Sequence, residues 1–200
     1  MNKKGTLQDK IDYGWYVTKH KANIVSPMHQ MGLPLTQALA HDLSKYRPSE
    51  FGPYSEWFNG PKGLKGAHDD ETHKKWRKAV ELHYSRNPHH WRKQGLTPEQ
   101  VPMKYKEESV ADWYSVGKTN RPKHTDYPTF KQWYTQRQEK LPIDKATKNE
   151  ISTQLGLKGK FLHKAKKQRD LTDRVLDVAI AQTNKGIPGI VKEVVTNASA

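Results

Sequence analysis

Apolar side chains recur at steps of three and four residues along most of the first 120 positions of this 200-residue chain. Tyr13, Val17 and Ile24 form one such stripe, and Trp76 and Val80 belong to another. This spacing gathers apolar side chains on one face of a helix, whereas a half-buried strand alternates apolar and polar residues. The sequence shows no convincing strand alternation, so it predicts an all-α fold. The predicted helices span residues 7–25, 35–46, 48–58, 71–86 and 99–117.

The composition changes after residue 120, which indicates three parts. Residues 1–120 are predicted to form a helical core. Residues 121–143 are rich in Pro, Tyr and Lys and are predicted to connect the core to the C-terminal segment, with one helix at about 130–141. Residues 144–200 are predicted to form a C-terminal helical extension. We expect this extension to pack on the core or on a partner, because free helices rarely expose so much apolar surface.

The charge and the cysteine content limit the classes of partner and of metal ligand that this chain can use. The chain has 35 Lys and Arg against 21 Asp and Glu, a net charge of +14, which favours an anionic partner such as a nucleotide, a nucleic acid or an acidic protein. The same charge could serve solubility alone. There is no cysteine, so a metal would be held by imidazoles and carboxylates. No apolar run is long enough to cross a membrane and no secretory segment is visible, so we expect a cytoplasmic protein.

The stretch ALAHDLSKY, residues 38–46, places His41 and Asp42 among small and apolar side chains. Its pattern predicts a buried helix, in which an ionised aspartate costs several kcal/mol unless it is paired or bound to a metal. His20, on the apolar stripe of the first helix, and Asp112, on the 99–117 helix, are the candidate partners. Two imidazoles and two carboxylates suit Mn, Fe, Co, Ni or Zn, with Mg as a further possibility. Neighbouring helical residues diverge by about 100°, so the ion would lie over the edge between His41 and Asp42.

A second group of histidines lies in ELHYSRNPHHW, residues 81–91. His83 is predicted to end a helix, and His89 and His90 follow a turn. Together they could help to hold a second ion, which Asp42 would bridge to the first. We favour His83 and His90 over His89 as ligands. The alternative is a helix end with surface imidazoles.

The order His, His-Asp, His cluster, Asp resembles the HD-domain superfamily of metal-dependent phosphohydrolases, and more narrowly an uncharacterised HD-like family common in bacteriophages. The segments that carry the resemblance are VTKHKANI, LAHDLSKYRPSEF, HYSRNPHHW and ESVADWYSV, within about residues 10–118. The resemblance implies a helical bundle in which His20, His41, Asp42 and Asp112 surround a metal. It also implies hydrolysis of a phosphate ester, often in a nucleotide, in the host cytoplasm or in association with a virion. Some HD-like proteins with two irons are oxygenases, which is a further alternative.

Several residues near the doublet are candidates for substrate binding and catalysis. Lys45 and Arg47, together with Arg86, could bind phosphate oxygens. Many members of the superfamily carry an acid soon after the doublet, and the nearest acid here is Glu50, which could orient the water or a metal ligand. Asp42, Lys45 and Glu50 are therefore the predicted catalytic residues.

Two further features of the sequence are less specific. His68 and Asp69 form a second His-Asp pair, but their polar neighbours predict a solvated loop rather than a site. A basic cluster in the extension could contact nucleic-acid phosphates or could simply be a solvated helix face. It consists of Lys160, Lys164, Lys166, Lys167 and Arg169. The alternative function is therefore a non-enzymatic, phage-type structural or nucleic-acid-binding protein on an HD-like scaffold.

Overall fold

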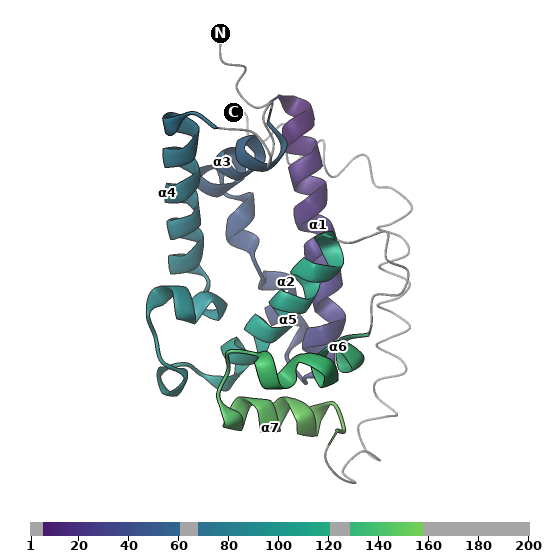
Figure 1. Cartoon of the computed structure of the whole chain (residues 1–200). Helices are drawn as coiled ribbons and strands as arrows, with labels where there is room; N and C mark the ends of the chain where they lie inside the picture. The colour runs from purple at the N-terminus through teal and green to yellow at the C-terminus, as the bar shows by residue number, and fades with distance from the viewer. Residues whose placement is uncertain (1–5, 61–67, 121–128, 158–200) are drawn as a thin grey trace.

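The computed structural model, shown in Figure 1, describes residues 6–60, 68–120 and 129–157. Within these ranges the chain is helical and contains no strand, which confirms the all-α prediction. The main helices are α1 (Leu7–Gln30), α2 (Leu35–Ala40), α3 (Pro48–Asn59), α4 (Asp70–Arg86), α5 (Met103–Asn120), α6 (Phe130–Arg137) and α7 (Lys145–Gln154). Four 3₁₀ helices complete these ranges: η1 (Leu43–Tyr46), η2 (Pro88–Gln94), η3 (Pro98–Gln100) and η4 (Gln138–Lys140). None of the described helices has the length and apolar character needed to cross a bilayer.

Two apolar clusters lie along the length of α1. Tyr13 and Val17, from the first half of this helix, pack with side chains of α3 and α4. Ile24 and Met28, from its second half, pack with side chains of α5, α6 and α7. Figure 1 shows the corresponding arrangement: α3 and α4 lie near one end of the molecule, and α6 and α7 lie together at the other. His20 is buried on α1 between the two clusters, so a polar site divides the interior.

Residues on either side of position 120 share one core. Phe130, Trp133 and Tyr134 of α6 and Ile151 of α7 belong to the same cluster as Ile24. The described part of the predicted extension therefore packs on the core. The boundaries at residues 120 and 144 remain predictions, and Lys160, Lys164, Lys166, Lys167 and Arg169 lie outside the described residues.

The predicted helix over residues 35–46 is wrong in its second half. The helix α2 ends at Ala40, His41 leaves the helical region with φ −52° and ψ 127°, and Asp42 is left-handed with φ 54° and ψ 21°. A short 3₁₀ helix, η1, comes next. Leu39 and Leu43, which the sequence suggested were buried, are 56% and 54% exposed. The pattern ALAHDL favours helix by propensity, but tertiary contacts of the His-Asp pair override that preference.

The second His-Asp pair also differs from its prediction as a solvated loop. The side chain of Asp69 accepts a hydrogen bond from the backbone N–H of Thr72 and so caps α4. His68 stacks on Trp57, with ring centroids 4.0 Å apart. The pair therefore starts a helix, and among the described residues it does not join a group of potential metal ligands.

Candidate metal centre

The first group of potential ligands combines α1, α5 and the His-Asp turn. Nε2 of His20 lies 3.1 Å from Oδ1 of Asp112 and 3.2 Å from Nε2 of His41. The same nitrogen lies 3.5 Å from Oδ2 of Asp42. All four side chains are buried, and their ligand atoms lie within 4.8 Å of one another. The structure thus brings together the four residues that the sequence proposed for one ion.

The break after α2 explains how two adjacent residues reach one interior. Consecutive side chains on a continuous helix would point about 100° apart. Here the left-handed backbone of Asp42, which Asp tolerates better than most residues, turns both side chains inward. Lys21 of α1 holds the turn from outside, because its ammonium donates to the carbonyls of Leu39 and His41, both at 2.7 Å.

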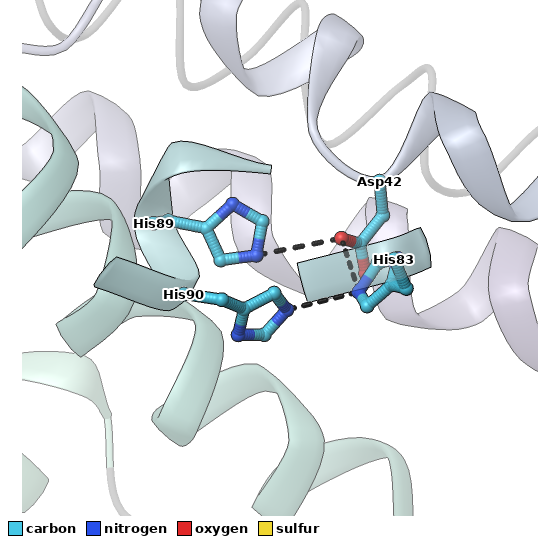
Figure 2. Close-up of side chains that lie close together, drawn as sticks. All are labelled: Asp42, His83, His89 and His90. Atoms are coloured by element: carbon cyan, nitrogen blue, oxygen red, sulfur yellow. Dashed lines mark hydrogen bonds and ion pairs between the residues drawn. The ribbon is translucent and has the colours of Figure 1, made fainter. Parts of the chain in front are cut away.

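The second group lies around the other oxygen of Asp42, as Figure 2 shows. Oδ1 of Asp42 lies 3.3 Å from Nε2 of His83 and 3.4 Å from Nε2 of His89. Nε2 of His90 lies 2.9 Å from Nε2 of His83. These histidines come from the end of α4 and from η2, where the chain turns at Pro88 and brings His89 and His90 back over α4.

The donor atoms fit a bound cation. Oδ1 of Asp42 and Nε2 of His89 are buried, lie 3.4 Å apart and make no hydrogen bond among the described residues. Oδ2 of Asp42 pairs with Lys45 at 2.6 Å. Unpaired polar atoms in the interior are costly unless a ligand satisfies them. Imidazole nitrogen and carboxylate oxygen are the ligands that divalent transition metals use in the absence of cysteine. Asp42 would provide one oxygen to each group and so bridge two ions.

Glu50 and Glu108 contact the Nδ1 atoms of three of these imidazoles, on the side opposite the Nε2 atoms. Glu50 accepts from Nδ1 of His83 at 3.1 Å and from Arg86 at 2.7 Å. Glu108 lies 2.8 Å from Nδ1 of His41 and 3.2 Å from Nδ1 of His89. Such contacts fix the ring orientation and leave each Nε2 directed toward Asp42 or its neighbours.

The electrostatic environment keeps Asp42 and Asp112 ionised. Burial alone would raise the pKa of Asp42, but the neighbouring His41 and Lys45 hold that pKa well below its usual range. Burial opposes the charge of Asp112 as well, yet hydrogen bonds from His20 and His41 keep its pKa well below the ordinary value. Burial lowers the pKa of Lys45, but Asp42 and Asp112 together outweigh burial, so the net shift is upward.

The pKa values of the two histidines of η2 are shifted in opposite directions. Burial lowers the pKa of His89, but Asp42 and Glu108 outweigh burial and raise it to about 10. Burial and the nearby charge of His89 lower the pKa of His90 to about 2. Burial raises the pKa of the Glu108 carboxyl, but its contacts with His41 and His89 outweigh burial and lower that pKa to about 2.

The predicted catalytic and substrate-binding residues differ in where they lie. Lys45 is at the centre, with Nζ 2.6 Å from Oδ2 of Asp42. Glu50 is fully buried behind His83, where it can orient a ligand but does not contact Asp42 directly. Arg86 is occupied by Glu50 and Ser49. Arg47 is exposed at the start of α3, and its side chain makes no hydrogen bond or ion pair with the described residues.

Sequence reasoning missed or underrated three residues. His89, ranked below His83 and His90, is more buried than His90 and faces Asp42. Glu108 lies one helical turn before Asp112, and this spacing could have marked it as a residue on the same face of α5. Lys21 follows His20 directly, and the sequence holds no signal that it would contact the end of α2.

Residues 9–157 match a protein family described as "Family of unknown function (DUF5662)". The chain belongs to this family. No curated protein and no solved structure matches the chain. The part that matches DUF5662 contains every residue of both ligand groups, from His20 to Asp112.

A cavity of about 450 Å³ opens beside the centre of this DUF5662 protein. His41, His89 and Glu108 form part of its wall, so it reaches the side of the imidazoles that faces away from Asp42. Lys104 adds positive charge to the same wall, and Arg86, which is paired with Glu50, adds a polar group. The cavity is therefore suited to an anionic or polar ligand next to the centre.

Proposed function

We propose that this protein is a metal-dependent phosphohydrolase of HD type that acts in the cytoplasm on a nucleotide or another phosphate ester. One observation carries the proposal: Asp42 is buried, with Oδ2 near the imidazoles of the first group and Oδ1 near those of the second. A carboxylate in this position is the expected bridge of a two-ion centre. The ordered His, His-Asp, His cluster and Asp resemblance to the HD superfamily supports the same function.

The residues that would hold the ions are those of the two groups. His20, His41, Asp42 and Asp112 form the first set, and Asp42, His83, His89 and His90 form the second. Mn, Fe, Co, Ni or Zn suits these donors best, with Mg as a further candidate. When bound, such cations act as Lewis acids that lower the pKa of water and draw charge from phosphoryl oxygens.

The protein's own side chains would bind and orient the substrate around this centre. Lys45 carries a partly buried ammonium beside Asp42 and would hold a non-bridging phosphate oxygen. Glu50 would position His83 through its hydrogen bond to Nδ1. Lys104, on the cavity wall, favours substrates with negative charge, whereas Arg86 is already paired with Glu50. Arg47 is less suited to this role than Lys45, because it is exposed and makes none of these contacts.

The test is metal content together with hydrolysis of a nucleotide panel supplied with Mn, Co or Mg. We expect about two metal equivalents per chain, and release of phosphate from at least one phosphate ester. Asp42→Asn should lose both metal and turnover, whereas Asp70→Asn, an exposed acid at the start of α4, should keep both. A wild-type protein that binds no divalent cation would contradict the proposal. Iron in both positions without hydrolysis would favour oxygenase chemistry instead.

A second candidate function is nucleic-acid binding, which the net charge of +14 favours. The residues proposed for it are Lys160, Lys164, Lys166, Lys167 and Arg169. The full-length chain should bind DNA or RNA with an affinity that falls steeply with salt, because phosphate contacts release counterions. Substituting Lys166, Lys167 and Arg169 by Gln should weaken binding and flatten the salt dependence. Unchanged binding would contradict a role for this cluster.

A further inference from the structure

Besides Asp42, a second carboxylate contacts both halves of the candidate centre. Glu108 is buried on α5, and its Oε1 lies 2.8 Å from Nδ1 of His41 and 3.2 Å from Nδ1 of His89. Its second oxygen accepts a hydrogen bond from the amide of Gln37 at 2.6 Å. His41 belongs to the first ligand group, and His89 belongs to the second. Apart from Asp42, the ion pairs of the described residues place no other carboxylate against a histidine of each group.

The contacts define what Glu108 does to each ring. A carboxylate accepts hydrogen bonds, so Nδ1 of His41 and Nδ1 of His89 must both carry a proton and donate it. Each neutral ring then has its lone pair on Nε2, which is the nitrogen that faces Asp42 in both histidines. A buried acceptor of this kind selects the tautomer, fixes the ring plane and makes the ligand nitrogen more basic.

The backbone position of Glu108 adds rigidity. Glu108 and Asp112 are four residues apart on α5, so one helical face presents a ligand of the first group and the acceptor of both histidines. Gln37 of α2 holds the other oxygen of Glu108 and ties it to the segment that carries His41. A shift of Glu108 would therefore move ligands in both groups together.

We infer that Glu108 is a positioning residue shared by the two metal sites, so that both sites depend on it for affinity. This inference rests on the proposed function, since it assumes that the two groups bind ions. His41, His89 and Glu108 could instead hold a third ion among themselves. That arrangement would require each imidazole to bind ions through both nitrogens, with no proton left on Nδ1, so hydrogen bonding is the simpler account.

The experiment titrates the metal-free, full-length protein with Zn²⁺ by calorimetry and measures bound zinc after dialysis. Glu108→Ala should weaken both sites, each by about 10- to 100-fold, which is the usual effect of losing such a partner. Glu108→Gln should weaken both sites less, because its carbonyl can still accept a hydrogen bond. The matched control is Glu107→Gln: Glu107 is the neighbouring buried acid, which accepts from Gln154 and does not contact a histidine of the centre.

A second readout separates positioning from general stability. Imidazole ¹⁵N spectra of the zinc-loaded wild type should show protons on Nδ1 of His41 and His89. In zinc-saturated Glu108→Ala these two Nδ1 protons should exchange faster with water, while the signals of His20 remain unchanged. Glu108→Gln, which keeps the side-chain shape, provides the same test if the alanine variant fails to fold.

The outcomes distinguish this inference from the proposed function. Suppose that the wild type binds two zinc ions. If the Glu108 variants then bind zinc as tightly as Glu107→Gln, or lose affinity at only one site, the inference is wrong and the proposed metal centre is still supported. A third equivalent that Glu108→Gln alone removes also overturns it, because Glu108 would then be a ligand. A wild type that binds no zinc overturns both.

Discussion

Asp42 combines an unusual backbone with a buried charge. The sequence predicted that it needs a partner, because its apolar neighbours would leave an ionised aspartate unpaired. The sequence did not predict the left-handed conformation, since no glycine marks the break and Ala38, Leu39 and Ala40 all favour helix. The need for a partner follows from local composition, whereas the turn depends on contacts with α1 and α5 that are distant in sequence.

The backbone of Asp42 predicts that two substitutions differ in stability. Asn tolerates the left-handed region, whereas a Cβ without a polar group is strained there. In metal-free protein, Asp42→Ala should therefore be less stable than Asp42→Asn by about 1 kcal/mol. Urea denaturation of the two variants in the presence of a chelator measures the difference. Equal free energies of unfolding would mean that the backbone of the alanine variant leaves the left-handed region at no cost.

His89 predicts the pH dependence of the metal-free protein. Its folded-state pKa is raised to about 10, so the stabilisation it provides is fully present below the unfolded pKa of about 6.5 and is lost as the pH rises through about 10. The free energy of unfolding should fall across this interval, and the fall should be smaller in His89→Gln. Denaturation curves at pH 6, 8 and 10 test it. A wild-type curve that stays level would contradict the ion pairs of His89 with Asp42 and Glu108.

At the scale of single elements, the sequence predicted the presence of helices better than it predicted where they end. Helices near α1, α3, α4 and α5 follow from regular apolar spacing, and the structure has them. The end of α2 was missed, because it is fixed by the contact of Lys21 with the carbonyls of Leu39 and His41 rather than by a local stop signal. The position of His89 was also missed, because η2 is a 3₁₀ helix whose side chains do not follow α-helical spacing.

The start of α7 offers a test at this scale. Asp144 caps the helix by accepting from the backbone N–H of Thr147 at 2.9 Å, and it pairs with the buried Lys106 at 3.0 Å. Asp144→Ala should lower the free energy of unfolding by about 1–2 kcal/mol, and Asp144→Asn by less, because Asn keeps the cap. Thermal or urea denaturation of the variants at pH 7 provides the comparison.

The same residue gives a defined acid response. Burial raises the pKa of Asp144, but the hydrogen bonds with Thr147 and Lys106 outweigh it and lower the pKa to about 2. A depressed pKa stabilises the fold above the unfolded value of about 3.9, and the contribution disappears as the pH falls through about 2. The stability gap between wild type and Asp144→Asn should therefore narrow from pH 5 to pH 2. A constant gap would show that the charge of Asp144 contributes nothing.

At the scale of the whole molecule, α6 and α7 complete the core around α1 and α5. The sequence separated residues after 120 by composition, but composition does not report that Phe130, Ile143 and Ile151 face the same interior as Ile24. Ile151 is fully buried, so Ile151→Ala should destabilise the protein by about 2–5 kcal/mol through lost packing and a residual cavity. Thr153→Ala, on the exposed side of α7, is the control and should change the free energy of unfolding little. Similar values for the two variants would mean that α7 does not support the core.

The path of α1 has a mechanical consequence. This helix of 24 residues is about 36 Å long. Each of its halves packs in an apolar cluster, and an ionisable side chain lies between them. Divalent ions seated against His20 would crosslink its midpoint to the His-Asp turn and to α5, while either end keeps its own packing. Chelation should then speed hydrogen–deuterium exchange most in the middle turns of α1, and the two ends should keep their protection.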